Sequence, residues 1–283
     1  MQKVVLNNGV EMPILGYGVF LINDKKECEQ CVVDALETGY RLIDTAAGYA
    51  NEDAVGNGIK HSGIPREEIF VTTKLAIPEA GYENTKQAFE RSLNKLQLNY
   101  LDLYLIHMPY GNTYGSWRAM EELYRAGRIR AIGVSTHSVA RVLDLKLHNQ
   151  IAPAVSMVET HPFFQQNEYA ALLKESNIQM EAWGPLAQGN FDIFNNEVLM
   201  SIGKKYGKSV SQVTLRWLIQ RGIVAIPKSV HKNRMAENFN IFDFELSPQD
   251  ISKIASLDTG KSIFHDLGEV GFMMACHDFR NPT

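Results

Sequence analysis

Short apolar runs alternate with amphipathic stretches along nearly the whole chain, and this alternation limits the folds that are available to it. The runs expected to form strands lie at 14–20, 42–46, 70–74, 101–107, 129–135, 152–159, 178–184 and 223–229. Helical patterns separate them, for example at 84–96, 115–127 and 165–177. Strict alternation of strand and helix is typical of right-handed βαβ units, and therefore of a parallel sheet.

Eight such units favour a closed barrel over an open, doubly wound sheet. An open dinucleotide-binding sheet would need G-x-G-x-x-G directly after a strand. The nearest stretch, "GNGIKHSG" at 56–63, has the wrong spacing and lies inside a helical pattern. The sequence also has no Walker A motif. Glycines that close helical patterns are expected as left-handed caps at Gly39, Gly63, Gly127 and Gly222.

We expect one domain over residues 1–283, an α/β fold in the form of a (β/α)8 TIM barrel. Its length of 283 residues suits a single barrel of this kind, and no Pro/Ser-rich linker divides it. The Asn-Gly pair in "VVLNNGVEMP" predicts an N-terminal β-hairpin. Two helical patterns, 195–207 and 209–222, separate the last two strands, so the barrel should carry extra helices.

Composition excludes several classes of function. A net charge of −4 argues against non-specific binding to nucleic acid or anionic membranes, and no apolar run approaches the ~18 residues of a membrane span. Three cysteines, an odd number, fit a reducing compartment. Cys28 and Cys31 form a C-x-x-C, but no second Cys or His pair lies nearby, so we expect no metal site or redox dithiol. A cytoplasmic protein is predicted.

Polar and aromatic residues occur where the expected strands end, and in a barrel the site lies at the carboxyl ends of the strands. They are Asp44, Lys74, His107, Ser135, Glu159, Trp183, Lys228 and Ser229, with Tyr49 in the loop after the second strand. Each residue alone could be an ordinary polar strand end. Together on one rim they predict a functional site.

Four of these residue types suit proton transfer to or from oxygen. A tyrosine such as Tyr49 titrates near pH ~10 and needs help to act as an acid or base. The Lys74 ammonium would lower the pKa of that tyrosine, and Asp44 would supply the counter-charge of the lysine. His107 could orient a carbonyl oxygen or relay a proton. The set predicts proton delivery to a carbonyl or removal from an alcohol, which is half of a redox reaction.

The stretches "LIDTAAGYANEDAVG", "VTTKL" and "LYLIHMP" carry these four residues in order. With them the chain resembles the aldo-keto reductases over nearly its whole length, and is similar to diketogluconate reductase-like members of the short-loop bacterial branch. The resemblance implies a (β/α)8 barrel with Asp44, Tyr49, Lys74 and His107 as catalytic tetrad. It also implies NADPH/NADP+ as cofactor, bound in an extended form without a Rossmann fold.

The stretch "IPKSVHKNRMAEN" at 226–238 is similar to the adenosine-phosphate site of that family. The resemblance implies that Lys228, Ser229 and Arg234 hold the 2′-phosphate, and that Glu237 and Asn238 contact the adenine. Phosphate prefers Lys, Arg and the amides of a helix start as partners. The alternative is a solvated basic helix start without a ligand.

The resemblance also places Trp183, in "AWGPLAQG", where an aromatic ring stacks on the nicotinamide. Gly184 and Leu186 of the same stretch belong to the implied cofactor site. As an alternative, Trp183 would be a large core residue of its strand.

Two pairs of residues depart from the pattern of the family. Ser135 and Thr136 stand where the family usually has Ser-Asn, and Ser156 and Met157 stand where it usually has Asn-Gln. Thr136 still offers a hydroxyl to the nicotinamide carboxamide, whereas Met157 cannot donate a hydrogen bond. We therefore expect weaker positioning of the nicotinamide, by about 0.5–1.5 kcal/mol for one lost hydrogen bond.

On the substrate side, the resemblance assigns Phe20, Tyr49, His107 and Tyr110 to the pocket, with Phe264 from the C-terminal stretch. Phe20 replaces a frequent tryptophan, and the loop after His107 is short. An open mouth, and with it a broad or bulky range of carbonyl substrates, is predicted.

The expected function is NADPH-dependent reduction of aldehydes or ketones to alcohols, with Tyr49 as general acid and a small-molecule carbonyl compound as partner. By resemblance we expect a monomer that binds neither nucleic acid nor membrane. One alternative is a Schiff-base lyase with Lys74 as nucleophile, which needs a neutral amine. The other is an NADPH-binding redox sensor or regulatory barrel with little turnover.

Overall fold

Eight parallel strands form one sheet in the computed structural model, which describes residues 2–262. Each strand is hydrogen-bonded to the next one in the chain, as the predicted βαβ succession requires. The strands are β3 (Tyr17–Gly18), β4 (Leu42–Asp44), β5 (Phe70–Leu75), β6 (Leu101–Ile106), β7 (Ile129–Ser135), β8 (Val155–Glu159), β9 (Gln179–Trp183) and β10 (Val224–Ala225).

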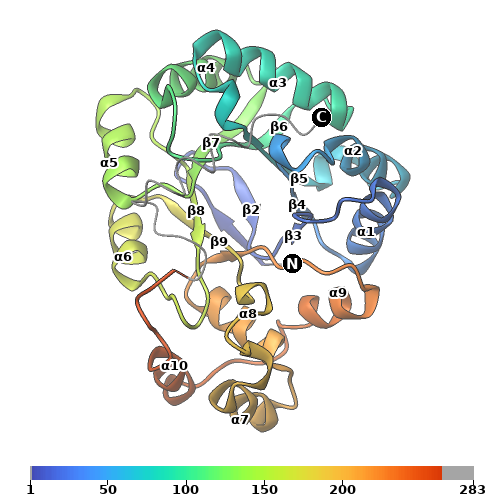
Figure 1. Ribbon diagram of the computed structural model, residues 1–283, viewed down its shortest axis with the longest axis vertical. Coiled ribbons are helices and arrows are strands. Elements are labelled where there is room, and N and C mark those ends of the chain that lie inside the picture. Colours follow the sequence, from blue (N-terminus) through green and yellow to red (C-terminus); the bar gives the residue numbers. More distant parts are fainter. Residues whose placement is uncertain (1, 263–283) are drawn as a thin grey trace.

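Backbone hydrogen bonds between the first and last strands close the sheet into a barrel. The N–H of Gly16 donates to the carbonyl of Ala225, and the N–H of Gly18 donates to that of Pro227. A parallel bridge joins Leu15 to Ala225. Figure 1 shows the resulting ring of strands with helices around it, so the predicted (β/α)8 barrel is confirmed.

Helices cover the outside of the ring. They are α1 (Lys25–Thr38), α2 (Glu52–His61), α3 (Tyr82–Leu96), α4 (Thr113–Arg125), α5 (Val139–His148), α6 (Asn167–Glu175), α7 (Glu197–Tyr206), α8 (Val210–Gln220), α9 (Lys232–Phe239) and α10 (Pro248–Ala255). The two predicted helices between the last two strands are present as α7 and α8. None of the helices in residues 2–262 is both long and apolar enough to cross a bilayer.

Several strands are shorter than the sequence suggests, among them β3, which covers only Tyr17–Gly18 of the expected 14–20, and proline explains two of these differences. The expected strand at 223–229 ends at Ala225, and Pro227 beyond it has no N–H to continue the ladder. The expected strand at 152–159 begins only at Val155, because Pro153 interrupts its first residues. Both changes lie at strand ends and leave the predicted order of elements intact.

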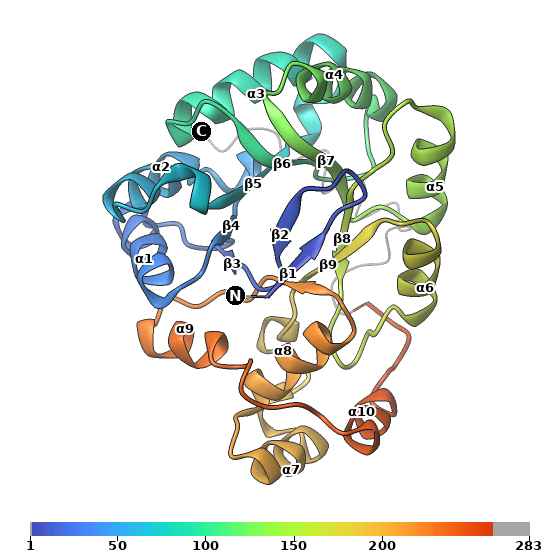
Figure 2. The same ribbon diagram turned by 180° about the vertical axis from the view of Figure 1, so that it is seen from behind.

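The predicted hairpin forms from β1 (Lys3–Val5) and β2 (Glu11–Pro13), with Gly9 at a φ of 84° in the turn. The side-chain amides of Asn7 and Asn8 donate to the carbonyls of Pro153 and Arg130, close to the starts of β8 and β7. The hairpin therefore lies across the amino-terminal end of the barrel (Figure 2). The carboxyl end of the strands is left for a site.

The four predicted cap glycines all have left-handed backbone conformations, with φ of 118° at Gly39, 68° at Gly63, 72° at Gly127 and 73° at Gly222. Gly39 is itself the C-cap of α1 and donates to the carbonyls of Ala35 and Leu36. Only glycine adopts this conformation without strain, so the sequence marks where these helices end.

Helix α2 packs closely against its neighbours through glycine. A Cβ on Gly56 would lie 2.4 Å from the carbonyl oxygen of Leu96 in α3, and a Cβ on Gly58 would lie 2.7 Å from Cβ of Val32 in α1. Because α2 directly follows the loop that carries Tyr49, these contacts hold that loop in place.

We predict that Gly56→Ala lowers the free energy of unfolding by about 1–3 kcal/mol, because the added methyl group meets backbone that cannot rotate away. Alanine is the better helix former, so propensity alone would predict a gain of about 1 kcal/mol. Urea unfolding decides between the two effects. Gly48→Ala is the matched control, since its added Cβ would have no neighbour within 4 Å. A Gly56→Ala protein as stable as its parent would contradict the packing argument.

Candidate active site

A buried ion pair joins two neighbouring strands at the carboxyl end of the barrel. Asp44 is the last residue of β4, and Lys74 is the second-last residue of β5. The ammonium of Lys74 lies 2.6 Å from Oδ1 of Asp44 and donates to the carbonyl of Thr45 at 2.9 Å. Lys74 is 1% exposed and Asp44 is 3% exposed. The ion pair predicted from the sequence is therefore present and buried.

The charge of Lys74 is held by its partners. Burial lowers the pKa of the Lys74 ammonium, but Asp44 and Tyr49 more than offset it, so this pKa lies above its ordinary value. Burial raises the pKa of the Asp44 carboxyl, and Lys74 opposes that rise. Lys74 thus stays a cation, which disfavours the neutral amine that a Schiff-base lyase needs.

Tyr49 ends the short 3-10 helix η1 (Ala47–Tyr49), and its hydroxyl accepts a hydrogen bond from Lys74 at 3.4 Å. Burial raises the pKa of Tyr49 above its ordinary value of 10, while Lys74 lowers it by a smaller amount. The expectation that Lys74 lowers the pKa of Tyr49 below its ordinary value is therefore wrong, because burial outweighs the effect of Lys74. At neutral pH the tyrosine keeps its proton, as a proton donor must.

His107 follows β6 directly and stands edge-on to Tyr49, with ring centroids 5.6 Å apart and an angle of 75° between the rings. Burial, together with the Lys74 charge, lowers the pKa of His107 to about 3. The imidazole is therefore neutral at physiological pH. It can hydrogen-bond to a substrate oxygen beside Tyr49 without adding a second positive charge.

The loop that carries Tyr49 is fixed by two buried polar residues that the sequence analysis missed. The amide of Asn51 donates to the carbonyl of Val19 at 3.0 Å and accepts from the hydroxyl of Thr45 at 2.9 Å. The next residue, Glu52, accepts from the hydroxyl of Thr73 on β5 at 2.7 Å. Both are buried at the start of an amphipathic helix, where solvated polar residues are usual, so the pattern alone gave no signal.

Of the residues assigned to substrate binding, Phe20 lies against the tetrad. Its ring centroid is 4.9 Å from that of Tyr49, and 44% of the residue is exposed. Phe20, Tyr49 and His107 are thus brought together at the mouth of the barrel. Tyr110 lies in the loop between β6 and α4, and Phe264 falls outside the described residues.

Three strands bring together the residues assigned to the nicotinamide end of the cofactor. Ser135 ends β7 and is paired in register with Met157 of β8, and Trp183 ends β9. Trp183 is only partly buried, so one surface of the residue remains accessible. Gly184 and Leu186 follow it, and Gly184 has a φ of 61°. A partly exposed indole at the mouth suits stacking on a nicotinamide ring.

Thr136 has a φ of 61°, in the left-handed region. This conformation is a genuine outlier for a β-branched residue and costs about 1–2 kcal/mol. Its N–H donates to the carbonyl of Met157 at 2.7 Å, which holds the backbone there. Asparagine, which the family pattern has at this position, tolerates the left-handed region much better.

Of the residues assigned to the adenosine-phosphate end, Lys228 and Ser229 lie between β10 and α9, and Arg234, Glu237 and Asn238 lie in α9. Lys228, Arg234 and Glu237 are exposed, whereas Ser229 and Asn238 are buried. Lys228 and Arg234 form no ion pair with any residue in the range 2–262. Two free cations beside the amides at the start of α9 suit a phosphate dianion.

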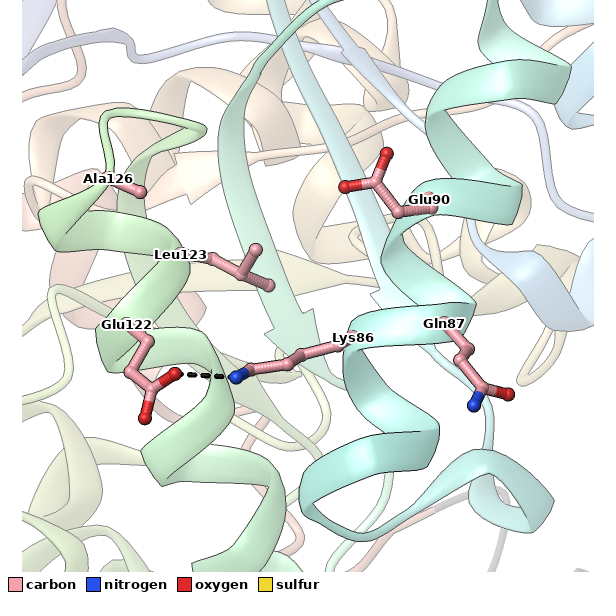
Figure 3. Close-up of a pocket in the computed structure, with 6 residues that line it drawn as sticks. All are labelled: Lys86, Gln87, Glu90, Glu122, Leu123 and Ala126. Carbon is pink, nitrogen blue, oxygen red and sulfur yellow. Dashed lines mark hydrogen bonds and ion pairs between the residues drawn. The ribbon is translucent and has the colours of Figure 1, made fainter.

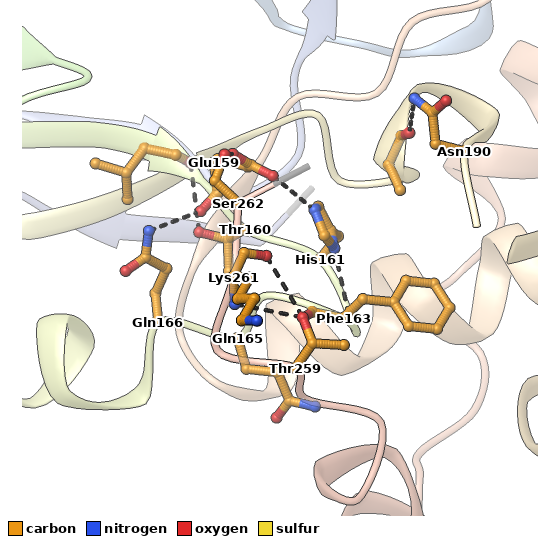
Figure 4. A network of polar contacts seen from close by, with 12 residues as sticks. Glu159, Thr160, His161, Phe163, Gln165, Gln166, Asn190, Thr259, Lys261 and Ser262 are labelled. Atoms are coloured by element: carbon orange, nitrogen blue, oxygen red, sulfur yellow. Dashed lines mark hydrogen bonds and ion pairs between the residues drawn. The ribbon is translucent and has the colours of Figure 1, made fainter. Parts of the chain in front are cut away.

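Glu159 ends β8 as expected for the rim, but it belongs to a different polar network (Figure 4). Its carboxylate accepts a hydrogen bond from Ser262 and contacts Nε2 of His161 at 2.9 Å. Thr259 also donates to the carbonyl of Phe163 at 2.7 Å. These bonds fasten the segment after α10 to the loop after β8, so Glu159 serves the structure rather than the tetrad.

Two other features lie away from the tetrad. A groove between α3 and α4 is lined by Lys86, Glu122 and their neighbours on the outside of the barrel, and a 2.6 Å ion pair between these two residues spans it (Figure 3). Cys28 and Cys31 are free thiols buried on α1, and burial raises the pKa of Cys28 to about 12. A thiol with this pKa is a poor nucleophile or metal ligand.

The sequence analysis also missed Glu181, in the middle of β9. Its side chain is fully buried, and neither carboxyl oxygen has a hydrogen-bond partner among residues 2–262. A buried carboxyl without a partner is expensive, so its presence requires an explanation.

The comparisons with known proteins agree with this geometry. The model of the "Aldo/keto reductase family" matches residues 15–259. A glyoxal reductase of Bacillus subtilis is 50% identical over 263 residues, which cover 93% of this chain and 95% of the relative.

Two solved structures are also similar. An aldo-keto reductase from a Medee basin deep-sea metagenome library has a TM-score of 0.92 and 46% identity, with 95% of this chain and 99% of that chain covered. An aldo-keto reductase of Bombyx mori, solved in complex with NADP, has a TM-score of 0.89 and 32% identity, with 96% of each chain covered. The chain belongs to the aldo/keto reductase family.

Proposed function

We propose that this chain reduces the carbonyl group of small aldehydes and ketones with NADPH, and that Tyr49 donates the proton. The observation that carries the proposal is the position of Lys74, whose ammonium contacts both Asp44 and the hydroxyl of Tyr49 at the mouth of a barrel. A protonated phenol beside a fixed cation is suited to releasing its proton as negative charge develops on a carbonyl oxygen.

Each member of the tetrad has a separate task. When bound, NADPH supplies the hydride that reduces the carbonyl carbon. His107, neutral and beside Tyr49, orients the carbonyl oxygen toward the phenol. As the proton leaves Tyr49, the Lys74 ammonium stabilises the phenolate that remains, and Asp44 holds Lys74 in position. Burial of the ion pair strengthens these interactions, because water does not screen them.

The residues present fit the cofactor at both of its ends. Lys228 and Arg234, which have no ion-pair partners among residues 2–262, suit the 2′-phosphate of NADPH, and NADH lacks that phosphate. Trp183 at the end of β9 suits the nicotinamide ring. The Bombyx mori relative, which was solved with NADP, supports this choice of cofactor.

Small dicarbonyl compounds are the substrate class that we favour. The Bacillus subtilis relative is named for glyoxal, which carries two adjacent aldehyde groups. Among residues 2–262, Phe20, whose ring packs beside Tyr49, is 44% exposed, which suits the approach of a small polar aldehyde to the phenol. The monomeric state, the cytoplasmic location and the absence of nucleic-acid partners stay predictions.

The alternatives are less well supported. The charged state of Lys74 is unfavourable for a Schiff-base lyase. A sensor that binds NADPH without turnover would not need a proton donor, a charge partner for it and an orienting histidine at one mouth. Strain at Thr136 and the loss of a donor at Met157 are the features that favour weak turnover, and both can be tested.

We predict that Tyr49→Phe lowers kcat for glyoxal reduction roughly 10²–10⁴-fold, because the proton donor is lost. NADPH binding, measured by fluorescence titration, should be unchanged. Tyr82→Phe is the matched control, since Tyr82 begins α3 on the outside of the barrel and donates to Glu122 there. Equal turnover by the Tyr49→Phe protein and its parent would remove Tyr49 from the mechanism.

We predict that Arg234→Ala raises the Kd for NADPH about tenfold and leaves the Kd for NADH unchanged, because one charge-assisted hydrogen bond to the 2′-phosphate is lost. Isothermal titration with both cofactors measures this difference. Lys232→Ala is the control, because Lys232 is on the same helix but already pairs with Glu37 at 2.7 Å. If Arg234→Ala weakened the binding of NADPH and NADH equally, Arg234 would not be a partner of the 2′-phosphate.

We predict that Thr136→Asn raises the free energy of unfolding by about 1 kcal/mol and tightens NADPH binding. Asparagine tolerates the left-handed backbone there and adds an amide beside the nicotinamide site. Urea unfolding and cofactor titration test the two effects separately. Thr136→Val keeps the β-branch and should show no gain in stability. If the Asn variant were less stable than its parent, the strain argument would be wrong.

A further inference from the structure

Glu181 is a fully buried residue in the middle of β9, one of the strands whose carboxyl ends form the site. Its register partners are Met157 on β8 and Val224 on β10, neither of which can neutralise a carboxylate. Strands β9 and β4 are separated by β10 and β3 around the ring, so Glu181 and Asp44 can interact only across the interior. Glu181 interacts electrostatically with Asp44, Lys74 and Tyr49, so its charge acts on the proton-transfer group.

Three carboxyl oxygens in this interior lack partners among the described residues. They are Oδ2 of Asp44 and both carboxyl oxygens of Glu181. Two ionised carboxylates would compete for the single ammonium of Lys74 at a buried site. Two neighbouring buried carboxyl groups can both ionise only at a high cost in free energy. A neutral Glu181 removes that conflict.

The groups that face Glu181 decide its charge. They are Asp44 from β4, Lys74 from β5 and Tyr49 from η1, while the neighbours on β8 and β10 are apolar. Burial raises the pKa of Glu181 well above its ordinary value; the charge of Asp44 raises it further, and Lys74 lowers it. The balance favours the acid form at neutral pH.

We propose that Glu181 is a positioning residue of the carbonyl-reducing site, where it stays a neutral carboxylic acid near the ion pair of Asp44 and Lys74. The interior then holds one carboxylate and one ammonium. The charge of Lys74 remains directed at Asp44 and at the hydroxyl of Tyr49. An ionised Glu181 would instead attract the Lys74 ammonium and repel a negative charge on Tyr49. The phenolate of Tyr49 would then be harder to form.

The charge of Glu181 can be measured without turnover. The infrared difference spectrum between the parent and Glu181→Gln, at neutral pH, should show the loss of the C=O stretch of a protonated carboxylic acid. Loss of a carboxylate band instead would overturn the proposal. The inference rests on the proposed role of Tyr49, but this readout does not, so failure of the carbonyl reaction and failure of the Glu181 assignment can be told apart.

The positioning role is tested with two neutral variants assayed with NADPH and glyoxal over a range of pH. Glu181→Gln keeps size, neutrality and a donor. Its kcat should stay within about threefold of the parent, and the alkaline limb of its profile, where Tyr49 loses its proton, should not move. Glu181→Met keeps neutrality but removes the polar carboxyl group from the interior. Its kcat should fall roughly two- to tenfold, with a smaller change in KM.

The outcomes separate a neutral, positioning Glu181 from an ionised Glu181 and from one that only fills space. A shift of the alkaline limb to lower pH in Glu181→Gln means that a negative charge beside Tyr49 has been removed, and the neutral-acid assignment falls. A Glu181→Met protein with the kcat and pH profile of the parent means that Glu181 only fills space. NADPH titration and circular dichroism establish that each variant is folded; if Glu181→Met does not fold, Glu181→Gln and the infrared measurement decide alone.

Discussion

The ion pair between Asp44 and Lys74 is the interaction on which the site depends. Two charges buried at 3% and 1% exposure are costly unless they meet in good geometry, and here they do so at 2.6 Å with a further bond to the carbonyl of Thr45. The pair joins neighbouring strands of a closed sheet, so the barrel itself holds the distance. Lys74 therefore acts on Tyr49 and His107 from a fixed position, in addition to the larger effect of burial on the pKa of each.

The order of strands and the tetrad could be predicted from the sequence because both follow from local rules. Alternating apolar runs and helical patterns define the barrel, and a barrel brings together residues at the carboxyl ends of strands that are distant in the chain. Asp44, Lys74 and His107 could therefore be placed at one rim before any distance was known. The helix caps at Gly39 and Gly222 could be predicted for the same reason, because a left-handed backbone conformation depends on the residue type at that one position.

The remaining features depend on contacts across the interior or on backbone angles, which no local pattern encodes. Glu181 looks like an ordinary strand residue until the closed ring turns it toward Asp44. In the sequence Thr136 is an ordinary hydroxyl residue, and only its φ of 61° shows that its backbone is strained. Glu159 was grouped with the rim because it ends a strand, yet its partners are His161 and Ser262. The net pKa of Tyr49 likewise depends on burial, which only the packed structure shows.

The costly features of this chain gather at one end of the barrel. The amino-terminal end is closed by the β1–β2 hairpin, whose Asn7 and Asn8 side chains satisfy exposed carbonyls near the strand starts. The carboxyl end instead holds a buried ion pair and a strained Thr136, and Glu181 below it has no hydrogen-bond partner among residues 2–262. Sites that must bind and release a cofactor and move a proton tolerate such local cost when the surrounding scaffold is rigid. The closed sheet supplies that rigidity. It keeps the geometry of proton transfer although several residues around the site lower the stability of the fold.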